Sequence, residues 1–186
     1  MAVLDNAIWL TGAGGTAQDG STVISEGGNS TSITGTFTGA WDASQSGYGI
    51  SEFGAFGVSS PITAGYAFSN PVENLAFTFD HVNGSGTTYD DMWTIHAYDE
   101  NGVLVPAADV IAGLSGIVDD RITINGDGSV SIDSQGTTAN DIDLVLPGKI
   151  SQLDLTFQNG PEGAQSGGSG ISDLSFTVPV APNYIV

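Results

Sequence analysis

The chain lacks cysteine and has almost no basic side chains, and each of these absences removes a class of function. Its 186 residues contain no cysteine, which excludes disulfide bonds and thiolate metal sites. Arg121 and Lys149 are the only lysine and arginine residues, against 21 acidic residues, and the formal net charge is −19. A surface so acidic repels nucleic acid and anionic lipid, so we expect neither as a partner.

Targeting and membrane signals are also missing from the sequence. The first residues, MAVLDNAIWLTGAGG, show no basic segment followed by a long apolar one, and no apolar run reaches membrane-spanning length. We expect neither a Sec-type signal peptide nor membrane insertion. Our prediction is an extracellular or cell-surface protein exported by a route such as type I secretion.

Glycine and small polar residues are abundant and dictate the fold class. The 27 glycines and many Ser, Thr, Asn and Asp residues separate short β-prone runs, and 40% of the residues are hydrophobic. This pattern predicts an all-β protein, an antiparallel β-sandwich of the jelly-roll kind with long Gly-rich loops. We expect one domain over residues 1–180 and a tail or linker over 181–186.

Several runs alternate between apolar and polar residues, as half-buried strands do. Leu75, Phe77 and Phe79 share one face, and so do Trp93, Ile95 and Ala97. Asn125-Gly126-Asp127-Gly128 lies between two further runs and predicts a tight hairpin. The sequence predicts eight to ten strands, a short helical turn over 106–113, and an irregular region over 38–60. The remaining predicted strands cover 32–37, 65–68, 121–124, 129–132, 142–146, 152–157 and 171–178.

Carboxylates crowd the turns around two of these strands, in the segment FTFDHVNGSGTTYDDMWTIHAYDENG (77–102). Neighbouring carboxylates about 4 Å apart repel by up to ~4 kcal/mol at an effective dielectric constant of 20, and the chain has few cations to offset this. Calcium prefers oxygen ligands of this kind. The alternative is plain turn chemistry, because Asp and Asn favour solvated turns. The residues predicted as calcium ligands are Glu26, Asp80, Asn83, Asp90, Asp91, Asp99, Asn101 and Asp173.

The catalytic signals are weak. Neither the G-x-S-x-G nucleophile motif nor the H-E-x-x-H metal motif occurs, and pairs of carboxylates at glycosidase spacing arise by chance among 21 acids. Aromatic rings beside polar groups suit a sugar instead, with core packing as the alternative for Trp41. The residues predicted to face a glycan are Trp41, Gln45, Tyr48 and Tyr89.

Four stretches, MAVLDNAIWLTGAGG, PVENLAFTFDHVN, DDMWTIHAYDENGVLV and SGISDLSFTV, give the chain a family resemblance. It resembles the N-terminal region of large secreted bacterial proteins that continue into RTX-type calcium repeats and a Hint domain. AYDENG followed by GISDLSF also resembles calcium-containing, carbohydrate-binding jelly rolls, in which Asp173 would be a calcium ligand. The chain departs from the first pattern because it has neither the Hint catalytic cysteine nor tandem RTX repeats.

The sequence therefore predicts a non-catalytic, calcium-binding β-sandwich module that attaches to a glycan or cell-surface polysaccharide. Two alternatives remain open at this point. One is a structural, self-assembling module of a surface layer, fibre or phage-like particle, which would form homo-oligomers through its strand edges. The other is a glycan-degrading enzyme.

Overall fold

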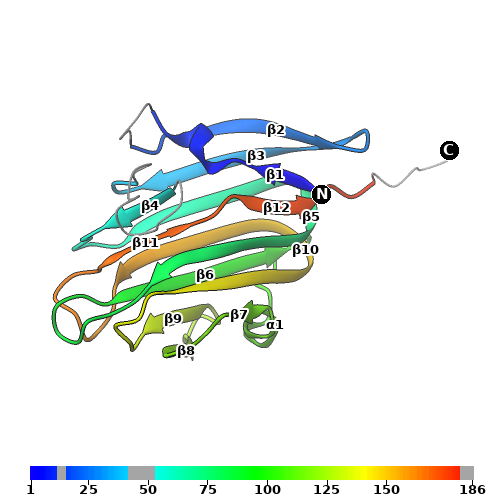
Figure 1. The fold of residues 1–186 in the computed structure, drawn as a ribbon. Helices are drawn as coiled ribbons and strands as arrows, with labels where there is room; N and C mark the ends of the chain where they lie inside the picture. Colours follow the sequence, from blue (N-terminus) through cyan, green and yellow to red (C-terminus); the bar gives the residue numbers. More distant parts are fainter. Residues whose placement is uncertain (12–15, 42–52, 181–186) are drawn as a thin grey trace.

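The computed structural model describes residues 1–11, 16–41 and 53–180, and within them the fold is all-β with one short α-helix (Figure 1). This confirms the predicted fold class. The described residues form twelve strands, more than the eight to ten expected. The elements are β1 (Ala2–Leu4), the 3-10 helix η1 (Asn6–Trp9), β2 (Gly20–Glu26), β3 (Asn29–Thr38), β4 (Phe53–Phe56), β5 (Ile62–Val82), β6 (Asp91–Asp99), α1 (Ala107–Ala112), β7 (Leu114–Ser115), β8 (Asp120–Ile124), β9 (Val130–Ser134), β10 (Asn140–Asn159), β11 (Gly168–Ile171) and β12 (Leu174–Thr177).

Two long strands, β5 and β10, organise the antiparallel sheet. The hydrogen-bonded order is β1-β12-β5-β10-β6-β9-β8, while β3 and β11 branch from β5, and β7 branches from β10. Such branching arises because different halves of a long strand have different neighbours. The first half of β5 pairs with β3, whereas its second half pairs with β12 and β11. The arrangement is consistent with a β-sandwich.

The bend in β10 explains why the sequence predicted two strands in its place. The pairing register with β5 shifts between Leu146 and Lys149 and again between Ile150 and Gln152. Gly148 lies within this bend and has a φ of +72°, which glycine adopts without steric cost. In Figure 1, β10 turns over at one end of the molecule. Because of the shift, the buried positions change from even to odd numbers along the strand. They are Ile142, Leu144, Leu146 and Ile150, then Leu153, Leu155 and Phe157.

The hydrophobic core is rich in stacked aromatic rings. The inward faces predicted for Leu75, Phe77 and Phe79, and for Trp93, Ile95 and Ala97, are confirmed, because all six side chains are buried. Trp93 lies at the centre, with its ring centroid 5.0 Å from that of Phe79 and 4.8 Å from that of Phe157. Phe157 is the residue of β10 paired with Trp93, whereas Phe79 lies in the second half of β5, so Trp93 packs against side chains of both long strands.

Trp41 belongs to this core, and the prediction that it faces a ligand is wrong. Its side chain is 1% exposed and stacks on Phe53 with ring centroids 4.9 Å apart. The indole Nε1 donates to the carbonyl oxygens of Thr38 and Thr63, both at 3.1 Å. A ring held and hydrogen-bonded in this way cannot stack on a sugar. Gln45 and Tyr48, two other predicted ligand contacts, lie outside the described residues.

The predicted hairpin is confirmed as β8 and β9. Its turn closes through a hydrogen bond from the Gly128 amide to the Asn125 carbonyl, at 3.0 Å. Ile124 pairs with Val130, and this register places Arg121 directly opposite Asp133. The short helix α1 follows Pro106, as predicted. Within the described ranges, no helix has the length and apolar character needed to cross a membrane.

Candidate metal centre

Three strand ends meet at one end of the sheet and carry the acidic side chains of the candidate site. Asp91, the first residue of β6, pairs with Asn159 at the end of β10. On the other side of β6, Met92 pairs with Asp133 in β9. Asp90 precedes β6 and Glu162 follows β10, so the topology alone brings Asp90, Asp133 and Glu162 into one neighbourhood.

Backbone hydrogen bonds lock the two loops of this end onto each other. The Asp90 amide donates to the Gln165 carbonyl at 3.0 Å, and the Gly160 amide donates to the Asp90 carbonyl at 2.8 Å. The Glu162 amide donates to Oδ2 of Asp90 at 3.1 Å. These contacts fix the Asp90 carboxyl against the loop that carries Glu162.

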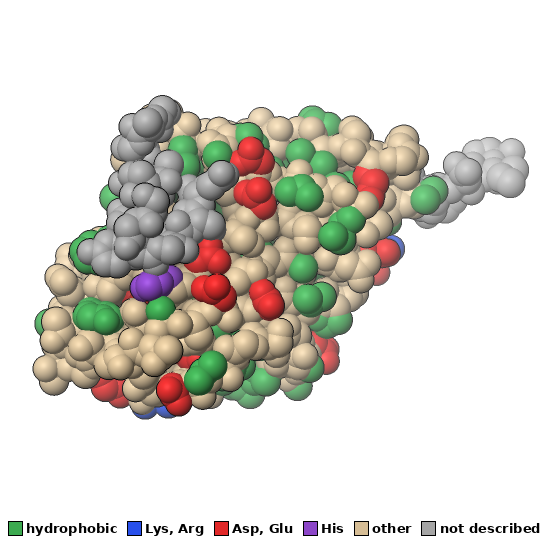
Figure 2. Space-filling model, viewed as in Figure 1, with side chains coloured by type: hydrophobic (Ala, Val, Ile, Leu, Met, Phe, Trp, Pro, Cys, Tyr) green, Lys and Arg blue, Asp and Glu red, His purple; other side chains and the backbone are tan. Residues whose placement is uncertain are grey.

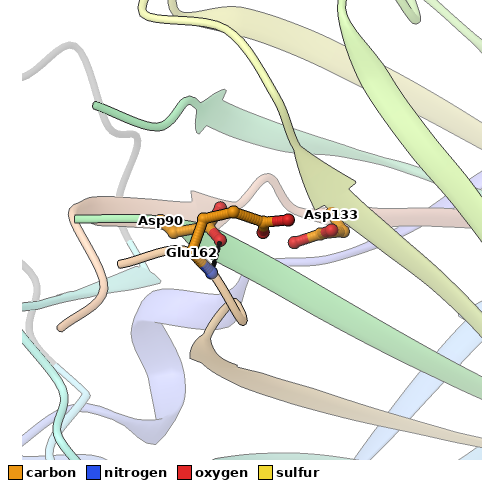
Figure 3. A group of neighbouring side chains, drawn as sticks. All are labelled: Asp90, Asp133 and Glu162. Carbon is orange, nitrogen blue, oxygen red and sulfur yellow. Dashed lines mark hydrogen bonds between the residues drawn. The ribbon is translucent and has the colours of Figure 1, made fainter. Parts of the chain in front are cut away.

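The three carboxyl groups converge from three separate segments (Figure 3). One ligand oxygen from each of Asp90, Asp133 and Glu162 lies within 4.8 Å of the others, and no other such group of three occurs among the described residues. Asp90 is 1% exposed and Asp133 is 2% exposed, while Glu162 reaches the surface. Oδ1 of Asp90 and Oδ1 of Asp133 are buried and have no hydrogen-bond partner. A buried carboxylate oxygen without a partner costs free energy, which a bound cation would recover.

The single arginine of the chain partly neutralises the group. Its guanidinium contacts Oδ2 of Asp133 and donates to Oε1 of Glu162 at 3.2 Å. It therefore occupies one oxygen of Asp133 and leaves the other unpaired. When all three carboxyl groups are ionised, they and the guanidinium sum to a charge of −2, which is the charge that a divalent cation balances.

The space around the group fits an ion. A cavity of about 60 Å³ adjoins it, lined by Tyr89, Asp90, Ser134, Gln135, Glu162 and two glycines. This volume holds an ion and a water molecule or two. A Cβ atom on Gly160 would lie 2.1 Å from Oδ2 of Asp90 and 2.6 Å from Oδ1 of Asp133. Glycine is required at position 160 because any side chain would displace both carboxylates.

Burial dominates the electrostatics of this end of the sheet. Desolvation raises the pKa of Asp90 to about 7, with the neighbouring charges of Asp133 and Glu162 adding to the effect. Desolvation likewise raises the pKa of Asp91 to about 7, against the lowering effect of hydrogen bonds from the Asn83 and Gly167 amides. It also raises the pKa of Asp133, although the Arg121 guanidinium opposes this shift.

These pKa values predict that the metal-free protein loses stability as pH rises from about 5 to 8. An unfolded aspartate has a pKa of about 3.9, so the folded protein binds more protons than the unfolded chain between these two values. That contribution is complete below pH 4 and disappears as pH rises through 7. The melting temperature in chelator should therefore fall from pH 5 to pH 8, and the fall should be smaller in the double variant Asp90→Asn/Asp91→Asn. A melting temperature that is flat or rises over this range in chelator would refute the assignment.

The structure places the predicted calcium ligands in different surroundings, and only one of them belongs to the carboxylate group. Asp90 belongs to the group, whereas both oxygens of Asp91 accept backbone amides, from Asn83 at 3.3 Å and Gly167 at 2.7 Å. Asp91 and Asn83 therefore hold the loop in place. Asp80 lies in β5 opposite Gly170, in the half of β5 that pairs with the beginning of β10 and not with the end of β10 that carries the group.

Asp99 and Asn101 form a solvated turn, the alternative considered for every acidic turn. Oδ1 of Asp99 accepts the amides of Asn101 and Val103 at 2.8 and 2.9 Å, and these hydrogen bonds lower the pKa of Asp99. Glu26 accepts the Val178 amide and contacts the N-terminal amino group, and Asp173 accepts the Asn6 amide. Glu26 and Asp173 thus have different partners in the structure.

Asp133 and Glu162 were missed, although the sequence held a signal for each. The Asn125–Gly128 turn sets the hairpin register, and counting outward from it pairs Arg121 with Asp133. Glu162 is the only acid between Asp154 and Asp173, and glycines stand close on both sides of it. Glycines beside a lone acid indicate a close approach of other groups to the backbone.

No protein-family model, curated protein or solved structure matches this chain. The arrangement of Asp90, Asp133, Glu162 and Arg121 must therefore be interpreted from its own chemistry.

Proposed function

We propose that this chain is a non-catalytic, extracellular binding module that holds a divalent cation, calcium, between Asp90, Asp133 and Glu162. The observation that carries the proposal is the convergence of three carboxyl groups, each with one oxygen within 4.8 Å of the others. Asp90 and Asp133 also each have a buried oxygen, Oδ1, without a hydrogen-bond partner. Calcium would join three separate segments of the chain and stabilise the end of the sheet to which they belong.

The donor set supports calcium over softer metals. All three groups are carboxylates, the hard oxygen ligands preferred by calcium, magnesium and manganese, and zinc favours nitrogen and sulfur. Two oxygens bound to one calcium lie at most about 5 Å apart, since each bond is about 2.3–2.6 Å long. The 4.8 Å limit on the separations meets this condition without rearrangement. Water would complete the six to eight ligands through the adjoining cavity.

The charge balance of the site suits an extracellular setting. Arg121 offsets one of three negative charges, so we expect affinity in the range of extracellular modules, with a dissociation constant of about 10⁻⁴–10⁻³ M. The acidic surface also supports this setting, because acidic side chains far outnumber basic ones on the face shown in Figure 2. Attachment to a surface glycan is the role we assign to the module.

Calcium should raise the melting temperature of the protein. At a free concentration of about 100 times the dissociation constant, binding to the folded state alone adds about 2.7 kcal/mol to the free energy of unfolding. For a chain of this size that corresponds to a rise of roughly 5–10 °C. Thermal unfolding with chelator, calcium and magnesium measures it. Identical curves in chelator and in saturating calcium would eliminate the proposal, and a larger shift with magnesium would reassign the ion.

A further inference from the structure

Beside the cation site lies a second cavity, about 260 Å³ in volume, which opens between β4, the end of β5 and the loop before β11. Among the described residues its walls combine two aromatic rings with amide and imidazole groups. The side chains are those of Phe56, His81, Asn83, Tyr89 and Gln165. Phe56 is 48% exposed, so its ring is accessible in part from solvent.

The backbone is shaped to form this cavity. Asn140 pairs with Val82 while Ile142 pairs with Phe79, so β5 carries one extra residue in a bulge at Asp80 and His81. His81 has a φ of +58°, and its amide is held by Oδ1 of Asp141 at 3.0 Å. A bulge of this kind redirects side chains out of the strand alternation. It directs His81 to the cavity wall.

The opposite wall is rigid. Oγ of Ser166 accepts the Val58 amide at 2.9 Å, and the Gly57 amide donates to the Gly167 carbonyl at 2.8 Å. A Cβ atom on Gly167 would lie 2.7 Å from the ring of Tyr89, so the ring packs directly on the glycine backbone. The cavity is therefore bounded by fixed groups.

From this cavity we infer a binding site for one uncharged sugar ring. Aromatic rings suit the C–H face of a sugar, and the side-chain amides of Asn83 and Gln165 offer hydrogen bonds to its hydroxyl groups. The imidazole of His81 lies 3.4 Å from the Asn83 amide nitrogen. No lysine or arginine lines the cavity within the described residues, and the carboxylates of Asp90 and Asp91 lie next to Tyr89. This charge disfavours an anionic ligand, and the polar groups disfavour an apolar one.

The cation and the sugar would share a wall. Tyr89 lines both cavities, and Asp90, the next residue, belongs to the carboxylate group. Glu162 and Gln165 likewise lie in one loop, which is held to the Tyr89–Asp90 segment by the Asp90 and Glu162 amides. A cation that fixes this loop also fixes the sugar pocket, and this dependence of sugar binding on calcium rests on the proposed cation site.

Saturation-transfer NMR with methyl glycosides of neutral monosaccharides, in calcium and in chelator, tests the inference. We expect at least one glycoside to bind with a dissociation constant near 1 mM. Phe56→Ala and Gln165→Ala should each weaken that binding about tenfold, and chelator should weaken it about fivefold. Both side chains are exposed, so neither variant should unfold the protein. Val145→Ala, at 49% exposure on β10, is the matched control and should bind as the wild type does.

Failures of the two proposals are distinguishable. If calcium raises the melting temperature but no glycoside binds at about ten times the expected dissociation constant, the sugar site is wrong and the cation site stands. Wild-type affinity in both Phe56→Ala and Gln165→Ala would also overturn the sugar site. Equal sugar affinity in calcium and in chelator would overturn the proposed dependence of sugar binding on calcium.

Discussion

Replacing Gly160 with alanine should strongly weaken calcium binding, although the variant keeps every ionisable residue of the site. The new Cβ would fall 2.1 Å from one oxygen of Asp90 and 2.6 Å from one of Asp133, so both carboxylates must move apart or turn away. Gly160 does not have a positive φ, so alanine strains no backbone angle there. We expect calcium affinity to fall by about 100-fold, which calorimetric titration measures.

Gly126→Ala is the matched control for this substitution. Gly126 lies in the turn between β8 and β9, does not have a positive φ, and would find no atom within 4 Å of its new Cβ. That variant should bind calcium as the wild type does. A second variant, Glu162→Gln, removes one charge from an exposed side chain and should weaken binding about tenfold without disturbing the core. Wild-type calcium affinity in both Gly160→Ala and Glu162→Gln would show that the three carboxylates are not the site.

Trp41→Ala should lower the free energy of unfolding by about 3–5 kcal/mol, because it empties a large volume in the middle of the core. The ring stacks on Phe53 and lies 6.1 Å, centroid to centroid, from Trp93. Its loss also leaves the Thr38 and Thr63 carbonyls without the indole donor. Chemical denaturation in saturating calcium measures the change.

Phe56→Ala provides the comparison for Trp41→Ala, since it removes an aromatic ring that is half exposed. It should cost less than about 1 kcal/mol of stability while weakening sugar binding. If Trp41→Ala left stability near the wild-type value and abolished sugar binding, the core position of Trp41 would be wrong and the ligand-facing prediction would be restored.

Local patterns predicted much of this fold from the sequence. The alternation of Leu75, Phe77 and Phe79 specified a buried face, and Asn125–Gly128 specified a hairpin. The bend of β10 was harder to predict, because the interruption at Pro147 and Gly148 reads equally well as a loop between two strands. Only pairing with β5 on both sides of the interruption keeps the chain in one sheet.

The candidate site was predictable only in part, because it also depends on strand pairing between distant segments. Asp90 stood out as one of two adjacent acids at a strand end. Its partners come from segments about 40 and 70 residues further along, and their meeting depends on the order of β10, β6 and β9 in the sheet. For Trp41, the local sequence pointed to a ligand contact that the structure does not have. Its glycine-rich surroundings resembled a binding loop, but the ring's burial depends on contacts with Phe53 and with Trp93, and Trp93 is distant in sequence.

A crystal structure of protein grown in calcium, with anomalous data to locate the ion, tests the central idea most directly. We expect an anomalous peak bounded by Asp90, Asp133 and Glu162, at about 2.3–2.6 Å from one oxygen of each. Ordinary water at that position, in crystals saturated with calcium, would mean that Arg121 and solvent alone balance these acids.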